Sequence, residues 1–243
     1  MAKAATKPTR PKPAKREVAK KAPVKLAPKA PVKLAPKAAP AKKGGVALRW
    51  NEDYTSRAYN RWTLGHPSQE LVGVIATLGL VPGSVALDVG CGVGVELVFL
   101  AKLGFKAIGI DVAPRALELA ADRARAAGVE LELHEGSAVS LPLEKDSVDF
   151  VNDRGLLQHL SESERGRFAR EVARVLRPGG ALVIRGAREP GEGVVPVTAQ
   201  SLDRHFDRRY FRFGPLLDIE LDGSDPSPGR MVILHRTADL FTP

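Results

Sequence analysis

Residues 85–96 read VALDVGCGVGVE, an apolar run that ends in Asp88 and passes into three glycines at alternate positions. Glycine lets the backbone turn tightly and approach a ligand closely. A helix is expected at Gly94–Leu103, and its first turn would offer free N–H groups to that ligand. A strand, glycine loop and helix in this order indicate a nucleotide-binding α/β domain, although Gly-x-Gly alone also fits dinucleotide enzymes.

The flanking residues narrow the choice of ligand. The spacing Gly90-x-Gly92-x-Gly94 differs from the Gly-x-Gly-x-x-Gly of pyrophosphate sites, and Asp88 would repel a pyrophosphate but favour an ammonium group. Asp111 ends the next strand, where a carboxylate can accept hydrogen bonds from two ribose hydroxyls. S-adenosylmethionine (SAM) has a ribose, a cationic amine and no phosphate, so the sequence predicts a SAM site.

Around this loop, strand-like and helix-like patterns alternate, which favours a mostly parallel sheet with helices on both faces. The last two strand candidates, Leu216–Leu221 and Met231–His235, have no clear helix between them and could pair as a hairpin at one edge. The other expected strands are Val85–Val89, Ala107–Ile110, Glu130–His134, Val148–Val151 and Ala181–Ile184, and the other expected helices begin at Ser68, Ala113, Ser161 and Ala199.

Three motifs together resemble one family. LDVGCGVG, GIDVAP and VLRPGGAL are similar to the glycine-rich loop, the second-strand acid and the pre-strand-five turn of class I SAM-dependent methyltransferases, from about Leu71 to the C-terminus. The resemblance implies a Rossmann-like fold with a doubly wound, mostly parallel, seven-stranded sheet, and SAM as the cofactor. The cofactor-binding residues predicted from these motifs are Asp88, Gly90, Cys91, Gly92, Gly94, Asp111 and Val112, with Cys91 as a small residue lining the loop.

Two further stretches resemble a narrower group, the thiopurine, halide and thiol methyltransferases. WTLGHPSQEL looks like the Trp-x-x-Gly-x-Pro segment that precedes the SAM domain there, and GSAVSLP and DFVNDRGLLQHL are similar to its third motif and its Asp-Arg-Gly. This resemblance implies that Arg154 lies at the SAM and acceptor pocket and that Ser137 and Ala138 contact the adenine. It also implies that Trp62, or less favourably Trp50, closes over the cofactor.

The expected reaction is an in-line displacement of the SAM methyl group by a small nucleophile, in which alignment can supply up to ~7–11 kcal/mol. A thiolate or halide needs little or no base, unlike many oxygen and nitrogen nucleophiles. His159 and Asp153 are the predicted catalytic residues: His159 is a candidate base because the pKa of histidine lies near neutral pH, and Asp153 is either a base or a residue that orients its loop. His66 is a second candidate base.

Charge divides the chain into two parts. Residues 1–45 hold fourteen Lys and Arg, one acid, eight prolines and the tandem repeat APVKLAPK, which predicts a disordered basic tail. The tail is either a solubilising leader or an arm with weak contact to nucleic acid or another polyanion. Residues 46–243 carry 23 basic and 27 acidic residues and form the predicted methyltransferase domain.

Three arginines of that domain, Arg185, Arg188 and Arg204, could hold an anionic acceptor or lie on the surface.

The sequence gives no support for a disulfide-rich, a membrane-spanning or a metal-binding protein. The single cysteine gives no internal disulfide, no run approaches the ~20 apolar residues of a membrane span, and no Cys/His cluster has metal-ligand spacing. We therefore expect a cytoplasmic enzyme without a metal. Its predicted acceptor is a small molecule, foremost a thiol or other soft nucleophile. The alternatives are an O- or N-methyltransferase of a secondary metabolite, or a nucleic-acid-associated protein that works through its tail.

Overall fold

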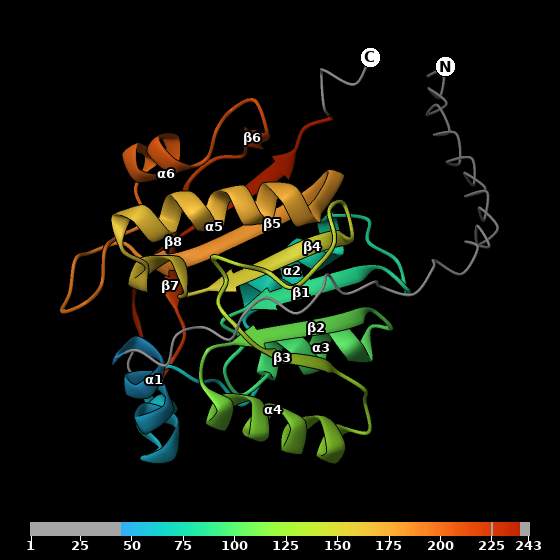
Figure 1. The fold of residues 1–243 in the computed structure, drawn as a ribbon, viewed down its shortest axis with the longest axis vertical. Helices are drawn as coiled ribbons and strands as arrows, with labels where there is room; N and C mark the ends of the chain where they lie inside the picture. Colours follow the sequence, from blue (N-terminus) through green and yellow to red (C-terminus); the bar gives the residue numbers. More distant parts are fainter. Residues whose placement is uncertain (1–44, 225, 239–243) are drawn as a thin grey trace, which may run out of the picture.

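The computed structural model describes residues 45–224 and 226–238, and the predicted basic tail therefore lies outside the described residues apart from Gly45. The described part is an eight-stranded mixed sheet with the order β3-β2-β1-β4-β5-β8-β6, in which β7 also pairs with β8 (Figure 1). The strands are β1 Val85–Val89, β2 Lys106–Asp111, β3 Glu132–Glu135, β4 Val148–Arg154, β5 Leu176–Ala187, β6 Phe211–Phe213, β7 Leu217–Leu221 and β8 Ser227–Arg236.

Strands β3, β2, β1, β4 and β5 run parallel, and every residue of β1 is buried. A strand covered on both faces reads as a continuous apolar run, which is why VALDV was recognisable as a strand. The register of β1 against β4 places Asp88 opposite Asn152 and Val89 opposite Asp153. The polar ends of the two strands therefore meet at the same edge of the sheet.

The antiparallel edge confirms the predicted hairpin, because β7 pairs with β8 from Leu217 opposite Met231 to Leu221 opposite Ser227. The short β6 pairs with the other half of β8, so that Phe211 lies opposite Arg236. Together β6 and β7 occupy the place of one outer strand, interrupted at residues 214–216. This interruption is why the sheet has eight strands where the resemblance implied seven.

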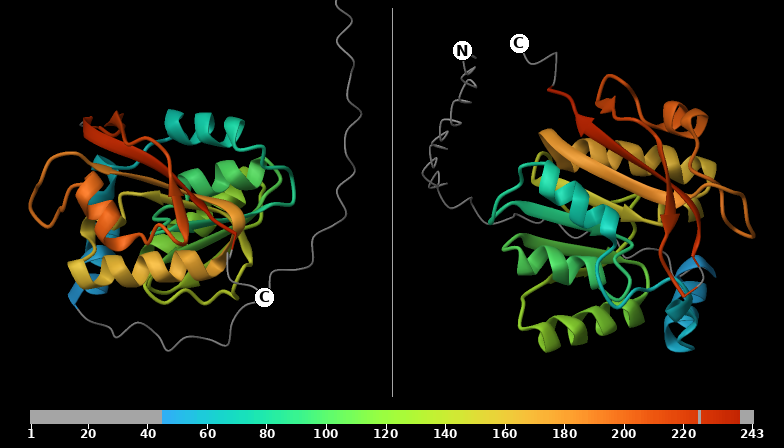
Figure 2. Two further views of the ribbon diagram at one scale, coloured as in Figure 1. Left: turned by 90° about the horizontal axis from the view of Figure 1, so that it is seen from above. Right: turned by 180° about the vertical axis from the view of Figure 1, so that it is seen from behind.

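Helices cover both faces of the sheet (Figure 2). On one face α2 (Gln69–Thr77) and α3 (Val95–Lys102) pack against β1, β4 and β5, with α4 (Pro114–Ala127) beside α3. On the other face α5 (Glu162–Val175) packs its apolar side against the same strands, and α6 (Ala199–His205) packs next to α5. The mostly parallel, doubly covered sheet confirms the predicted Rossmann-like methyltransferase fold.

The predicted helix starts at Ser68 and Ser161 are confirmed, and single groups define these and other helix ends. The Ser68 hydroxyl accepts from the backbone N–H of Leu71 at the start of α2, and Ser161 and Glu164 form the capping box of α5. Gly128 ends α4 in the left-handed conformation. These ends were predictable because caps depend on local residue types.

One predicted turn was wrong. The segment Pro178-Gly179-Gly180 does not separate α5 from a later strand, because α5 ends at Val175 and β5 begins at once with the buried Leu176. The ladder between β4 and β5 shifts register here. A Cβ on Gly180 would lie 2.9 Å from the carbonyl oxygen of Asp149, so the glycines serve an irregular strand rather than a turn.

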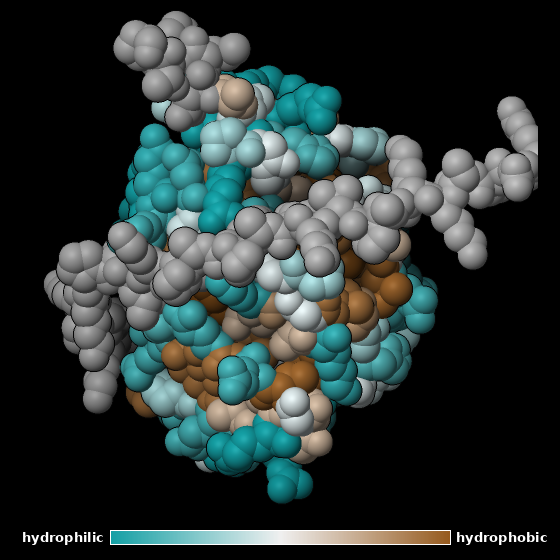
Figure 3. All heavy atoms as spheres, turned by 90° about the vertical axis from the view of Figure 1, so that its right-hand side faces the viewer, coloured by the Kyte–Doolittle hydropathy of each residue, from teal (hydrophilic) through white to brown (hydrophobic). Residues whose placement is uncertain are grey.

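The N-terminal segment folds over the edge where the parallel strands end. It comprises α1 (Gly45–Thr55) and the 3₁₀ turn η1 (Ala58–Arg61), and in Figure 1 α1 stands beside α4 at that end of the sheet. The side-chain oxygen of Asn51 accepts from the backbone N–H of Arg115 at 2.9 Å, which attaches α1 to the first turn of α4. Figure 3 shows the opposite side of the molecule, where the parallel strands begin. On this face hydrophobic residues are visible between hydrophilic ones. No helix within residues 45–224 and 226–238 is long and apolar enough to cross a membrane.

Candidate active site

A cavity of about 520 Å³ opens at the carboxyl ends of β1, β2 and β4. Its wall comes from the glycine loop, the end of β2, the loop at 136–138, the loop after β4 and the N-terminal segment, with a contribution from residues 221–223. Ligands of open α/β sheets bind in this place. The residues predicted for the site that line the cavity are Trp62, Asp88, Gly90, Cys91, Gly92, Asp111, Val112, Ser137, Ala138, Arg154 and His159, with Trp50 and His66 among the alternatives.

The glycine loop approaches its neighbours too closely for side chains. Gly92 has a φ of 52°, and a Cβ there would lie 2.8 Å from the hydroxyl oxygen of Tyr54 in α1. A Cβ on Gly90 would lie 3.1 Å from Leu156 in the loop after β4. Cys91 between them is buried, and its burial raises the pKa of the thiol well above the usual value. The thiol is therefore protonated and poorly suited to nucleophilic attack.

Gly94 requires a correction, because it does not line the cavity. It is the N-terminal cap of α3 with a φ of 73°, and a Cβ there would lie 2.9 Å from the Cβ of Ala120 in α4. Its contribution in the structure is the close packing of two helices. The third glycine of the pattern thus serves the fold, whereas the first two shape the site.

Asp111 connects the end of β2 to the glycine loop. Its two carboxylate oxygens accept from the backbone N–H groups of Gly92 and Ala113, both at 2.9 Å. The side chain is buried, and burial raises its pKa above the usual value. A carboxylate has about four acceptor positions, so these two bonds leave capacity for ligand hydroxyls.

A buried polar cluster that spans four elements lies in and behind the cavity wall. Arg185 of β5 donates to both carboxylate oxygens of Glu96 in α3, at 2.8 and 2.7 Å, and also to Ser68 and Asn152. The amide nitrogen of Asn152 in β4 donates to Glu96 and to Asp88, each at 2.8 Å. Asn152 therefore bridges the two carboxylates that face the cavity.

The two bridged carboxylates have opposite electrostatic surroundings. Burial alone would raise the pKa of Glu96, but the guanidinium of Arg185 lowers it to about 2. Burial raises the pKa of Asp88 to about 8, and the neighbouring charge of Glu96 adds to this increase. Below pH 8 Asp88 is thus mostly protonated, and a cationic group arriving beside it would favour the charged form.

None of the three arginines considered for an anionic acceptor lines the cavity, and the alternative of a surface position fits Arg188 and Arg204. Arg185 is 1% exposed and is engaged in the cluster behind the wall. Arg188 pairs with Glu189 and Asp218 on the surface, and Arg204 pairs with Glu162. Arg185 lies within β5, where side chains alternate between the two faces of the sheet, so its place in the chain did not reveal which face it occupies.

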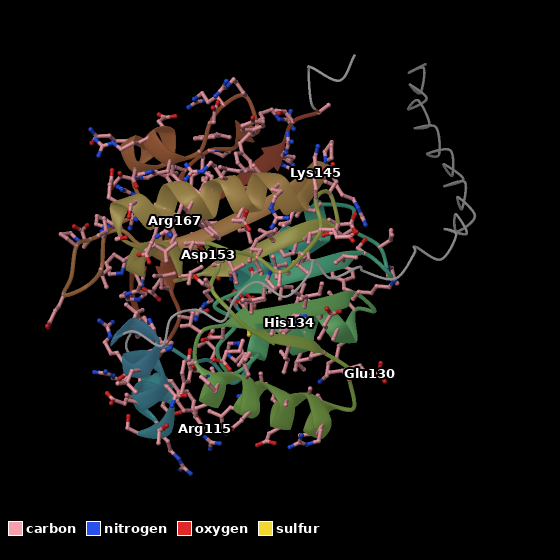
Figure 4. The ribbon with its side chains drawn as sticks, viewed as in Figure 1. Arg115, Glu130, His134, Lys145, Asp153 and Arg167 are labelled. Carbon is pink, nitrogen blue, oxygen red and sulfur yellow. The ribbon has the colours of Figure 1, made fainter. Side chains whose placement is uncertain are left out.

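Asp153, predicted as a catalytic residue, is fully buried and does not line the cavity. Figure 4 marks it within the body of the molecule, near α5. Its carboxylate accepts from the backbone N–H groups of Leu156 and Leu157, at 2.8 and 3.2 Å. Burial raises its pKa to about 7. This placement contradicts the role of a base for a ligand and fits the alternative, in which Asp153 orients the loop that carries His159.

Arg154 lines the cavity, but its guanidinium already holds two segments together. It donates to the carbonyl oxygens of Trp62, at 2.9 Å, and Asp222, at 2.5 Å. It thereby joins the N-terminal segment to the loop between β7 and β8. The expectation that Arg154 contacts a ligand stays a prediction, with the holding of these two segments as a further role.

The hydrogen bonds of His159 define its tautomer. Its Nδ1 lies 3.0 Å from the carbonyl oxygen of Gly193, which can only accept, so Nδ1 carries the proton. Its Nε2 lies 3.3 Å from Nε2 of Gln158. Gln158 is oriented by the bond from the backbone N–H of Ala187 to its Oε1 at 2.6 Å, so its NH₂ group faces the imidazole. Nε2 of His159 is therefore the lone-pair nitrogen.

The pKa of His159 is lowered from its usual value, mainly by burial and also by the charge of Arg49, although the bond to Gly193 opposes this shift. The imidazole is consequently neutral at pH 7. Trp50 packs edge-on against it, with ring centroids 4.9 Å apart, and also packs against Trp62 at 6.0 Å. Both tryptophans and the histidine thus meet at one end of the cavity. His66 also lines the cavity, but it is exposed and its Nδ1 lies 3.0 Å from the carbonyl oxygen of Pro67.

Several residues of the site were missed from the sequence. Glu96 offered a signal, since it is a single acid in the apolar helix VELVFLAK. Tyr54 and Gln158 offered none, because their roles depend on contacts with segments distant in the chain. Within residues 45–224 and 226–238 there is no group of three or more His, Cys, Asp or Glu side chains arranged to hold a metal ion.

Residues 86–180 match the protein family described as "Methyltransferase domain". The chain is 40% identical over 110 residues to methyltransferase GfsG of Streptomyces halstedii, covering 44% of this chain and 39% of the relative. It is 33% identical over 146 residues to erythromycin 3''-O-methyltransferase of Saccharopolyspora erythraea, covering 56% and 47%. The chain thus spans less than half the length of either relative.

The fold is also similar to solved structures. One, from work on the conversion of a disulfide bond into a thioacetal group during echinomycin biosynthesis, superposes with a TM-score of 0.70. It is 20% identical in sequence and covers 79% of this chain and 93% of the other. At this level of identity the likeness concerns the fold alone.

Proposed function

We propose that the chain, whose residues 86–180 match a methyltransferase domain, transfers the methyl group of SAM to an oxygen or nitrogen atom of a small molecule, with His159 as the general base. The observation that carries this proposal is the imidazole at the cavity, whose Nδ1 lies 3.0 Å from the carbonyl oxygen of Gly193, which leaves the lone pair on Nε2. Such a base, held by a second group, is typical of general base catalysis.

The cavity fits the cofactor. The close approaches at Gly90 and Gly92 keep side chains away from the loop backbone, and the cavity lies at the first turn of α3. The Asp88 carboxylate suits a cationic amine, and Asp111 has remaining acceptor capacity for ribose hydroxyls. When bound, SAM supplies a methyl group activated on a sulfonium. We assign the adenine to the wall formed by Ser137 and Ala138.

The acceptor atom follows from the base. A thiolate or halide needs no proton removed during the reaction, so an oriented neutral histidine would have no role for such an acceptor. A hydroxyl or amine loses a proton as its bond to the methyl carbon forms, and Nε2 of His159 can take that proton. The likeness to erythromycin 3''-O-methyltransferase supports an oxygen acceptor over the soft nucleophile suggested by the narrower resemblance.

The test measures release of S-adenosylhomocysteine with panels of phenols, alcohols, amines and thiols. We expect turnover of a hydroxyl or amine acceptor that falls by roughly 10²–10⁴-fold in His159→Asn. SAM affinity, measured by calorimetry, should remain within about twofold of wild type. The matched control is His134→Asn, in β3 outside the cavity wall, which should retain activity. Turnover confined to thiols and unchanged in His159→Asn would refute the proposal.

A further inference from the structure

The hydrogen bonds around Gln158 carry an inference about how the base is controlled. Gln158 lies in the 3₁₀ turn η2 (Leu157–His159), next to His159 in the chain. Its backbone carbonyl oxygen accepts from the N–H of Val195 at 2.8 Å, and its side-chain oxygen accepts from the N–H of Ala187 at 2.6 Å. Together with the bond from His159 to Gly193, three bonds attach η2 to residues 187–195.

These bonds leave the Gln158 amide a single orientation. If the amide were flipped, its NH₂ group would face the N–H of Ala187, and both groups would be donors without an acceptor. The NH₂ group therefore faces Nε2 of His159, and a donor there is compatible only with a lone pair on that nitrogen.

We propose that Gln158 is a positioning residue that holds His159 in the Nδ1–H tautomer and opposes its protonation at Nε2. The proposal rests on the proposed role of His159 as the base. An imidazolium would direct an Nε2–H at the donating NH₂ of Gln158, whereas the neutral ring accepts from it. At 3.3 Å this bond is long, so an acceptor hydroxyl or amine can replace the amide as the donor to Nε2 when it binds.

The charged group that acts on His159 from another element is Arg49 of α1, which also disfavours the imidazolium. Glu164 lines the same cavity, but its Oε2 accepts from the backbone N–H and the hydroxyl of Ser161 in the capping box. Trp50 contacts the ring without a charge. Gln158 is thus the side chain that bonds directly to Nε2 and is the one to change.

Gln158→Glu gives the decisive experiment, because glutamate has the shape of glutamine and its oxygen can still accept from Ala187. The carboxylate would then attract a proton to Nε2, so the acidic limb of the kcat/KM profile should move to higher pH by about one unit or more. Activity should fall near neutral pH and recover at high pH. Gln69→Glu, at an exposed position of α2, is the matched control and should leave the profile unchanged.

Nitrogen NMR of histidine-labelled full-length protein tests the same idea without turnover. The His159 signal, assigned by its absence in His159→Asn, should report Nδ1–H in the wild type and a mixture of tautomers in Gln158→Met. In Gln158→Glu its titration should shift to higher pH. A His159 titration and pH profile unchanged by Gln158→Glu would overturn the inference. If His159→Asn kept full activity while the NMR shifts occurred, the proposed catalytic role would fail and the control of the imidazole by Gln158 would stand.

Discussion

Arg185 and Glu96 form a bidentate ion pair, with N–O distances of 2.8 and 2.7 Å, in a position where both side chains are buried. The pair joins β5 to α3 behind the cavity, and Asn152 extends it to Asp88. Removing one partner of a buried pair leaves the other charge uncompensated, whereas an exposed pair contributes little to stability. This buried ion pair therefore supports the cavity wall from inside the protein.

Replacing Arg185 by leucine should destabilise the fold by about 3–5 kcal/mol, because Glu96 would be left buried and unpaired. Urea unfolding measures the loss. The comparison is Arg204→Leu, which removes an exposed pair with Glu162 and should cost at most about 1 kcal/mol. Similar losses in the two variants would show that the buried pair contributes no more than a surface pair.

The affinity for SAM should depend on the protonation of Asp88. The pKa of Asp88 is raised to about 8 by burial and then by Glu96, so the carboxyl must lose a proton before it can pair with the cationic ligand. Affinity should thus rise with pH towards 8, by up to tenfold per unit, with proton release that calorimetry in buffers of different ionisation enthalpy detects.

Asp88→Asn provides the reference for this measurement, because it keeps the shape but cannot titrate. It should bind SAM more weakly at pH 8 and lose the part of the pH dependence that belongs to the protein. The α-amino group of the ligand titrates in the same range, and its contribution to the pH dependence is the same for both proteins. Identical pH dependence in the two proteins would exclude Asp88 as the titrating group.

Gly92→Ala should weaken SAM binding by tenfold or more, because the new Cβ would lie 2.8 Å from the hydroxyl oxygen of Tyr54. The next nearest atom of that ring, Cζ, would lie at 3.6 Å, an ordinary contact. Adding Tyr54→Phe should therefore restore part of the affinity, leaving the left-handed strain of alanine at about 1–3 kcal/mol. Calorimetry on the two single variants and the double variant measures the coupling, and strictly additive losses would contradict the contact.

Arg49→Gln should raise the pKa of His159, because the guanidinium disfavours the imidazolium. The base is active when neutral, so the acidic limb of kcat/KM should shift to higher pH while the rate on the plateau changes little. Arg115→Gln serves as the control, since Arg115 lies on α4 in an exposed pair with Glu118. An unshifted limb would mean that Arg49 does not act on the base.

Local signals in the sequence were sufficient for the sheet and for one half of the site. The buried strand Val85–Val89, the caps at Ser68 and Ser161 and the acids Asp88 and Asp111 all depend on residues close in the chain, and each lies where it was predicted. The interruption between β6 and β7 escaped prediction, because each short strand is stabilised by pairing with β8 rather than by its own residues.

The role of each residue in the other half of the site could not be predicted, because these residues act through distant partners. Asp153 and His159 looked alike as candidate bases, but backbone N–H groups engage the first, and the second faces the cavity with a defined tautomer. Arg185 was indistinguishable from surface arginines until the structure placed it against Glu96.

The sequence by itself determined that a SAM-type loop follows β1 and that acids stand at the ends of β1 and β2, because a run of adjacent residues encodes a strand, a turn and a helix start. Only the tertiary structure decided which polar groups are charged, which face the cavity and which support it from behind. Burial and the pairing of groups from different elements set those properties, and neither is encoded in any one segment of the chain.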